Sequence, residues 1–221
     1  MRIARLIILV ITAVAALTIP TQSKAQVAFG VSVQFAPPAL PVYEQPPCPG
    51  DGYIWTPGYW AYDNDDGYYW VPGTWVLAPV GLLWTPGYWG WQDAAYVWYP
   101  GYWGPQVGFY GGIFYGFGYV GTGYEGGYWN HGAFYYNRSV NNVRNVTNVY
   151  NKTVVNNVTV NNVSYNGGQG GTTARPTAAE QAAARAPHTQ PTAEQVQHER
   201  AASTNRSQLA SVNHGKPVQS I

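Results

Sequence analysis

The sequence predicts a mainly β protein: an antiparallel meander of short Trp-Pro-Gly-Trp hairpins, followed by an Asn/Val-rich extended segment and a short helical or disordered tail. One observation is an eight-residue phrase that recurs four times between residues 53 and 105. A second is that turn-forming stretches such as Asp63–Gly67 separate the copies. A third is the regular spacing of the copies, which is typical of a repeated supersecondary unit.

The four copies read YIWTPGYW, YYWVPGTW, LLWTPGYW and YVWYPGYW, with lead tryptophans at positions 55, 70, 84 and 98. Proline presets φ for the first central position of a turn, and glycine accepts a positive φ at the second. Each Pro-Gly is therefore expected to form a type II turn at a hairpin tip. The residues predicted to build the repeat are Trp55, Pro57, Gly58, Trp60, Trp70, Pro72, Gly73, Trp75, Trp84, Pro86, Gly87, Trp89, Trp98, Pro100, Gly101 and Trp103.

The phrase Y-x-W-x-P-G-x-W resembles the YXWGXW (WXXGXW) repeat of exported bacterial proteins. The third copy departs from the pattern, because Leu82 replaces the leading tyrosine. Two later stretches, 164–177 and 210–215, also resemble the tail of some of these proteins. The resemblance covers most of the mature chain and implies an extracytoplasmic protein, but it implies no activity and no functional residues.

A Pro-Gly tip would place the two tryptophans of one copy opposite each other, Trp55 with Trp60 in the first copy. Four such pairs would form an aromatic spine through residues 53–136, which we expect to be one all-β domain. Tyrosines on the other face are expected to stay solvent-accessible and to mediate association. These candidate interaction residues are Tyr59, Tyr69, Tyr88 and Tyr102.

Residues 1–25 are predicted to be a secretory signal peptide. Arg2 and Arg5 precede an apolar run from Leu6 to Ile19, and small residues occupy the positions that signal peptidase reads in Ser23-Lys24-Ala25. The mature chain would start at Gln26, with no transmembrane helix after signal removal. The predicted location is the periplasm or the outer cell envelope, with secretion into the medium as a third option.

Charge is unevenly distributed along the chain. Residues 26–137 contain seven acidic residues and no lysine or arginine, whereas the region from Arg138 onward is basic. Nucleic-acid binding on aromatic platforms needs cations along the backbone path, so we expect no nucleic-acid partner. The single cysteine, Cys48, lies far from the signal peptide and has no intrachain disulfide partner.

No catalytic constellation is evident, and we expect neither an enzyme nor a cofactor or metal site. The acidic residues Asp63, Asp65 and Asp66 lack the ligand order of a calcium loop, so a turn explains them. His131 has no second histidine or cysteine nearby and is expected in a turn.

The remaining segments follow in order. Residues 26–52 form a Pro-rich extended leader. Residues 104–128 interleave glycine with aromatic residues; twisted strands and turns against the tryptophan repeat are favoured over a membrane helix, because glycine is costly in helices. Residues 128–136 predict one more hairpin, with Asn130-His131-Gly132 at its tip.

The carboxyl-terminal part divides in two. Residues 137–166, rich in Asn, Val and Thr, predict either a long twisted strand pair or a segment ordered only in an assembly. Residues 167–221 predict a flexible tail with two short helices, at about 177–186 and 192–203. Each helix begins with a capping box, Thr177 to Glu180 and Thr192 to Gln195.

Two function classes remain. The first is a non-enzymatic structural or interaction protein of the cell envelope that associates with itself or with an envelope protein. The second is a module that binds envelope glycans or other polymers through exposed aromatic residues. Association with a membrane surface is compatible with both. Tryptophans that line an open groove would favour the second class, and interdigitated tryptophans the first.

Overall fold

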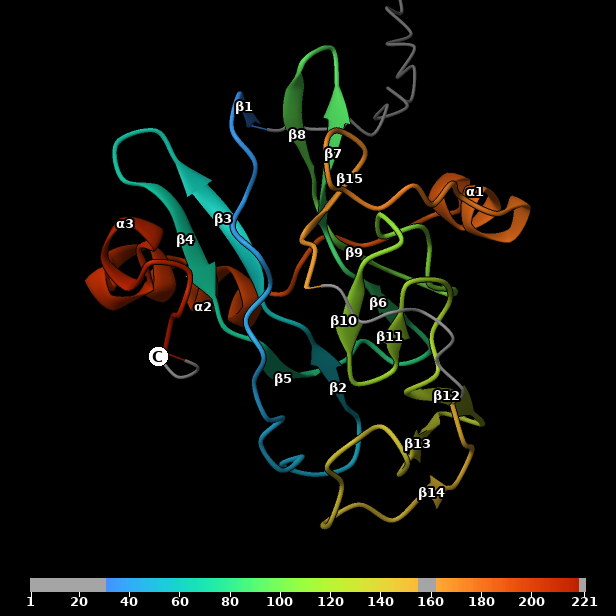
Figure 1. The fold of residues 1–221 in the computed structure, drawn as a ribbon. Helices are drawn as coiled ribbons and strands as arrows, with labels where there is room; N and C mark the ends of the chain where they lie inside the picture. Colours follow the sequence, from blue (N-terminus) through green and yellow to red (C-terminus); the bar gives the residue numbers. More distant parts are fainter. Residues whose placement is uncertain (1–30, 155–161, 219–221) are drawn as a thin grey trace, which may run out of the picture.

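The computed structural model describes residues 31–154 and 162–218, and it is mainly β (Figure 1). The predicted signal peptide, the predicted new terminus at Gln26 and part of the Asn/Val-rich segment lie outside the described residues. Short antiparallel hairpins make up the body, and small helices follow near the carboxyl terminus. The predicted fold class is therefore confirmed.

The first two copies of the phrase form one long hairpin rather than two short ones. Its inner strands are β3 (Tyr59–Asp63) and β4 (Gly67–Val71), which pair antiparallel across the acidic turn at residues 64–66. Its outer strands are β2 (Tyr53–Thr56) and β5 (Thr74–Leu77), which pair antiparallel farther from that turn. Both Pro-Gly dipeptides thus interrupt the two sides of one hairpin.

The third and fourth copies repeat this arrangement. Strand β7 (Tyr88–Gln92) pairs with β8 (Ala95–Tyr99), and β6 (Leu83–Thr85) pairs with β9 (Tyr102–Gly104). The tip is Asp93-Ala94, and both residues have positive φ, 48° and 65°. Two consecutive residues with positive φ suit the twist of a tight hairpin turn.

The position predicted for the Pro-Gly turns is therefore wrong. None of the four glycines that we expected at positive φ lies in that region. The chain reverses instead at residues 64–66, within a segment that we took as a link, and at Asp93-Ala94, which we had not identified as a turn. Pro-Gly was chosen for turn chemistry alone, whereas the strand pairing depends on contacts between different copies.

The glycine-aromatic stretch packs against the repeat hairpins as predicted. It contains the small hairpin of β10 (Phe114–Gly116) and β11 (Tyr119–Val120). The hydroxyl of Tyr115 donates to the carbonyl of Gly87 at 2.7 Å, and that of Tyr119 donates to the carbonyl of Trp84 at 2.9 Å. Within the described part of the chain, no helix is both long and apolar enough to cross a membrane.

The predicted hairpin around His131 is confirmed. Strands β12 (Gly127–Asn130) and β13 (Ala133–Asn137) pair antiparallel, and His131 and Gly132 form the tip with φ of 47° and 78°. Strand β14 (Val149–Tyr150) adds to β13 in parallel.

Most of the described Asn/Val-rich segment is turns and coil, not the long strand pair that we considered. Apart from Asn137, the last residue of β13, the strands there are β14 and β15 (Tyr165–Asn166), and β15 lies parallel to β7. Asparagine side chains organise this region. Asn137 is fully buried, and its side-chain amide donates to the carbonyls of Glu125 and Lys152, both at 3.0 Å. These bonds serve loop carbonyls that have no strand partner.

The Pro-rich leader crosses the first hairpin and accepts hydrogen bonds from its aromatic residues. The indole nitrogen of Trp60 donates to the carbonyl of Ala39 at 3.0 Å, and that of Trp75 donates to the carbonyl of Pro46 at 2.8 Å. An extended polyproline-like chain makes no internal hydrogen bonds, so its carbonyls are free to accept. A two-residue strand at its start, β1 (Ser32–Val33), pairs with β8.

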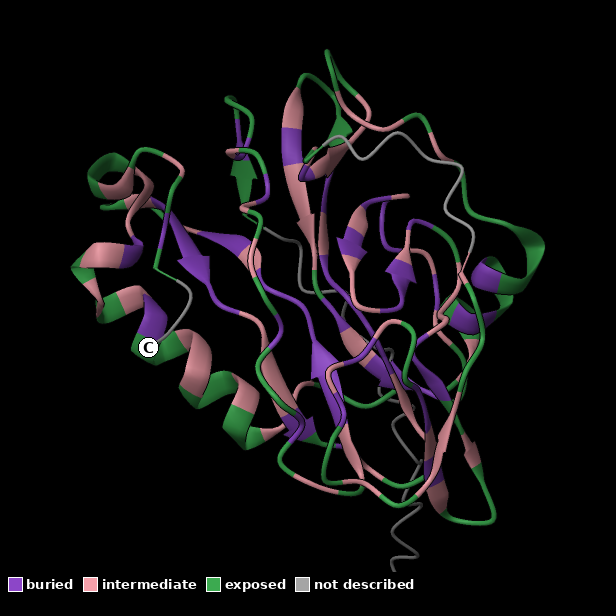
Figure 2. Ribbon diagram, turned by 60° about the horizontal axis from the view of Figure 1, so that its bottom comes forward, coloured by how far each residue is buried: buried purple, intermediate pink, exposed green. Residues whose placement is uncertain are grey.

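The two predicted helices are present as α1 (Ala178–Arg185) and α2 (Ala193–Thr204), and both predicted capping boxes are formed. A 3-10 turn (Arg206–Gln208) and a short helix α3 (Ala210–Asn213) follow. Figure 1 places α1 and α2 on opposite sides of the β body. In Figure 2 the helices carry many exposed residues, whereas buried residues concentrate on the strands.

The tail with its two helices makes contacts with the repeats that we did not predict. Residues Thr189 and Leu209 form isolated β-bridges with Trp103 and Tyr69. Ala202 of α2 is fully buried. The sequence argument counted only the apolar residues within the helices, whereas docking uses backbone pairing and polar side chains.

Candidate functional site

Tryptophans of different copies pair across the strands of each long hairpin. In the first hairpin, Trp55 lies opposite Trp75 with ring centroids 5.4 Å apart, and Trp60 lies opposite Trp70 at 5.3 Å. The expected spine pairs within one copy are therefore wrong, because the chain does not fold back at Pro-Gly. The second hairpin repeats the pattern with Trp84 and Trp103 at 5.3 Å and Trp89 and Trp98 at 5.4 Å.

The repeat glycines are needed for close approach rather than for positive φ. A Cβ on Gly58 would lie 2.3 Å from the Cζ2 atom of Trp70 and 2.9 Å from the backbone nitrogen of Gly73. A Cβ on Gly73 would likewise lie 2.3 Å from Cζ2 of Trp55 and 3.0 Å from the nitrogen of Gly58. Only glycine lets the two backbones approach under the indole rings.

A pocket opens between the two long hairpins where their Pro-Gly segments meet. It encloses about 630 Å³ of empty space, part of it open to solvent. All four repeat prolines line it, so the motif itself builds this site. The other lining residues are Thr56, Tyr59, Val71, Thr74, Trp84, Gly87, Trp98, Gly101, Tyr115, Pro191, Gln195, His198 and Glu199. We call it the inter-repeat pocket.

A comparison with protein-family models matches the WXXGXW repeat at residues 50–76 and 80–103. The chain carries two copies of the WXXGXW repeat. Each matched copy spans two of the eight-residue phrases and coincides with one long hairpin. No curated protein and no solved structure matches the chain.

Helix α2 covers one side of the pocket between the WXXGXW repeats. The side-chain oxygen of Gln195 accepts from the indole nitrogen of Trp103 at 2.8 Å and from the backbone nitrogen of Thr192 at 2.9 Å. One capping residue thus both starts the helix and docks it. Nε2 of His198 lies 2.8 Å from the carbonyl of Pro72, and since a carbonyl only accepts, this nitrogen carries the proton.

The α2 contribution to the site is what sequence reasoning missed. The capping box located the start of the helix, but nothing in the sequence paired Gln195 with Trp103, which lies 92 residues earlier. Glu199 is one turn farther along the same helix, beside the hydroxyl groups of Tyr59 and Tyr69.

The four candidate interaction tyrosines do not form an exposed surface. Tyr69 is only 7% exposed, and the other three are half-buried. Tyr59 stacks on Trp98 of the second repeat, with centroids 5.1 Å apart and an interplanar angle of 18°. Tyr88 stacks on Tyr99 of its own repeat at 4.8 Å.

Tyr102 contacts the ring of His188 at 4.6 Å. The predicted solvent accessibility is thus wrong, because the chain's own tail and neighbouring rings cover these side chains.

The acidic segment that starts at Asp63 forms a turn, as we expected. The carboxylate of Asp63 accepts from the backbone nitrogen of Asp65 at 2.8 Å, which is an Asx turn. Within the described residues, no group of three metal-ligating side chains comes together. Cys48 is a free cysteine, 1% exposed, and burial raises the pKa of its thiol.

Because several tyrosine hydroxyl groups are buried, the protein is expected to lose stability at alkaline pH. Desolvation raises the pKa of Tyr43 to about 12, and desolvation with the Glu199 carboxylate raises the pKa of Tyr59 well above its ordinary value. The unfolded chain ionises near pH 10, so its tyrosines release protons that the folded state keeps. The stability that these neutral, buried tyrosines contribute is therefore fully present below pH 10 and decreases as the pH rises towards 12.

We expect tyrosinate absorbance and loss of far-ultraviolet circular dichroism to rise together in an alkaline titration. Complete tyrosine ionisation near pH 10 with an unchanged dichroism spectrum would contradict the buried positions of these side chains.

Proposed function

We propose that this protein is a non-enzymatic, exported structural or interaction protein of the bacterial cell envelope, built on its WXXGXW repeats. The observation that carries the proposal is the use of tryptophan for internal packing. Six of the eight repeat tryptophans are at most 7% exposed, and their rings pack against one another or against the leader and tail. Interdigitated tryptophans support a scaffold more than an open binding groove.

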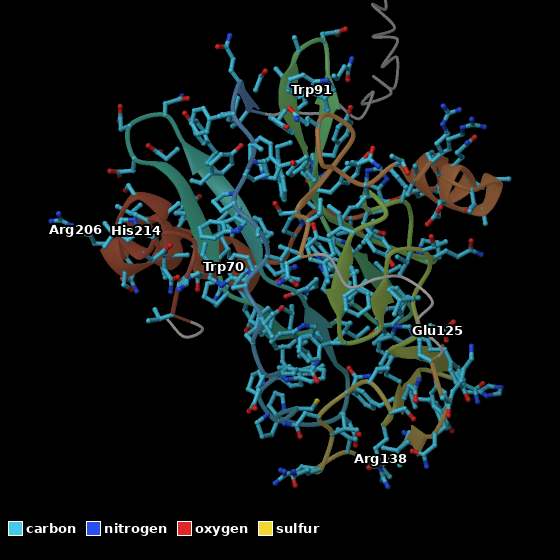
Figure 3. The ribbon with its side chains drawn as sticks, viewed as in Figure 1. Trp70, Trp91, Glu125, Arg138, Arg206 and His214 are labelled. Carbon is cyan, nitrogen blue, oxygen red and sulfur yellow. The ribbon has the colours of Figure 1, made fainter. Side chains whose placement is uncertain are left out.

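A second candidate is a module that binds envelope glycans or polymers through exposed aromatic residues. Trp91 is 40% exposed and Tyr128 is 47% exposed, which supports this candidate. They belong to separate hairpins, however. Figure 3 shows Trp91 at the tip of the β7–β8 hairpin, apart from Trp70 in the body, and Tyr128 lies on β12 at the other end of the view (Figure 1). Separate rings offer a weaker platform than a continuous aromatic face.

Export is tested on the protein from its native host. We expect the mature form to lack residues 1–25 and to begin at Gln26, because Ser23-Lys24-Ala25 carries the cleavage signal. Intact-mass measurement of the envelope fraction checks this directly. Recovery of the full-length chain from the cytoplasmic fraction would contradict the proposal.

Crosslinking in the same envelope fractions separates the two candidates. A structural role predicts crosslinks to copies of this chain or to envelope proteins. Recovery with peptidoglycan that is lost on glycan digestion would favour the binding module instead.

A further inference from the structure

The walls of the inter-repeat pocket are aromatic rings and prolines. Tyr59, Trp84, Trp98 and Tyr115 line it together with the four repeat prolines. Tyr59 and Trp98 stack on each other across the two hairpins, and Trp98 and Trp84 also contact Trp89 and Trp103. Aromatic faces carry negative charge density and attract cations, especially when water is excluded.

The charge of the pocket has one sign. Glu199 is the only carboxylate among the described residues that line it, and no lysine or arginine lines it. Glu199 belongs to α2, and its carboxylate lies beside the Tyr59 hydroxyl at the pocket wall. The Nε2–H group of His198 donates to the Pro72 carbonyl. An anionic ligand would therefore meet the carboxylate with no compensating cation.

We propose that the inter-repeat pocket binds a small organic ammonium ion, with the charge next to Glu199 and the alkyl groups against the rings and prolines. Alkylated ammonium ions combine positive charge with apolar surface, which matches both features of this pocket. A bare metal cation lacks that surface and would lose its hydration shell among apolar groups. The inference goes beyond the proposed envelope role and does not depend on it.

Choline and its neutral tert-butyl analogue form the test, because they share shape and differ in charge. We expect isothermal titration calorimetry on the mature chain to show saturable binding of choline. The analogue should bind at least about tenfold more weakly than choline, since it loses both the cation–π attraction and the contact with Glu199. Equal binding of the two compounds, or no binding of choline, would overturn the proposal.

Two pairs of variants locate the site. Glu199→Gln removes the charge and should weaken choline binding about tenfold. Glu194→Gln, on the exposed first turn of the same helix, should leave it unchanged. Trp98→Leu should weaken binding as well, whereas Trp91→Leu, outside the pocket, should not. Thermal melts identify any variant that fails to fold. If one variant of a pair does not fold, the other pair provides the test. If the control variants weaken binding as much as the pocket variants, the assignment is wrong.

The ammonium group could belong to a soluble amine or to a lipid headgroup. Sedimentation with phosphatidylcholine vesicles distinguishes these sources. Choline binding without vesicle binding supports a soluble amine, and Glu199-dependent binding of both supports the headgroup. Vesicle binding that is insensitive to Glu199→Gln, with no binding of choline, would overturn the site.

Discussion

Gly58→Ala is expected to lower the free energy of unfolding by about 3 kcal/mol, at the upper end of the usual cost of overpacking. The new methyl group would lie 2.3 Å from Cζ2 of Trp70 and 2.9 Å from the backbone nitrogen of Gly73. Trp70 is fully buried, so its ring cannot turn out to solvent without disturbing the core. The facing backbone belongs to the other half of the hairpin, so relief would require the two halves to separate.

Gly50→Ala is the matched control for this variant. No atom lies within 4 Å of a Cβ at Gly50, and the residue is not at positive φ. We expect its effect to stay within about 0.5 kcal/mol, as for most surface substitutions. Urea denaturation of both variants gives the comparison. If Gly58→Ala were as harmless as the control, the close approach of the Gly58 and Gly73 backbones would be refuted.

The sequence predicts the fold class and several elements because their signals are local. The tip at His131 and Gly132 follows from three adjacent residues, and the two capping boxes follow from spacings of three. Such signals need no knowledge of distant contacts. The repeat itself is equally visible, because its spacing is regular.

Strand partners were not predictable in the same way. Pro57-Gly58 and the acidic segment after Asp63 both have turn composition, so the local sequence permits a reversal at either place. The decision lies in the mutual fit of Gly58 and Gly73, which belong to different phrases. Each matched WXXGXW copy likewise contains two phrases.

The candidate site was harder still to predict, because single polar contacts assemble it. The prolines, Tyr59 and Trp98 come from the repeat, and their importance was evident from the sequence. Helix α2 reaches the pocket through Gln195 and His198, whose partners are far away in the chain. No periodic pattern encodes such contacts, so a tail judged by its few apolar residues seemed independent of the repeats.

Trp89→Ala is expected to cost about 4 kcal/mol of stability, within the range for truncating a buried tryptophan. Trp89 is 2% exposed, and its ring lies 5.3 Å from that of Tyr68 in the other repeat. Its indole nitrogen also donates to the carbonyl of Trp60 at 2.7 Å. The variant therefore removes an apolar contact and a hydrogen bond that join the two WXXGXW hairpins.

Trp91→Ala provides a control on the same strand. Side chains two positions apart point to the same face, so both tryptophans share orientation and differ in burial. Trp91 is 40% exposed and contacts Tyr96 at 4.7 Å, so we expect a loss of about 1 kcal/mol. Chemical denaturation of the two variants measures the difference. Equal losses would mean that Trp89 does not help to join the hairpins, whereas a large loss confined to Trp89→Ala would support a junction that includes this side chain.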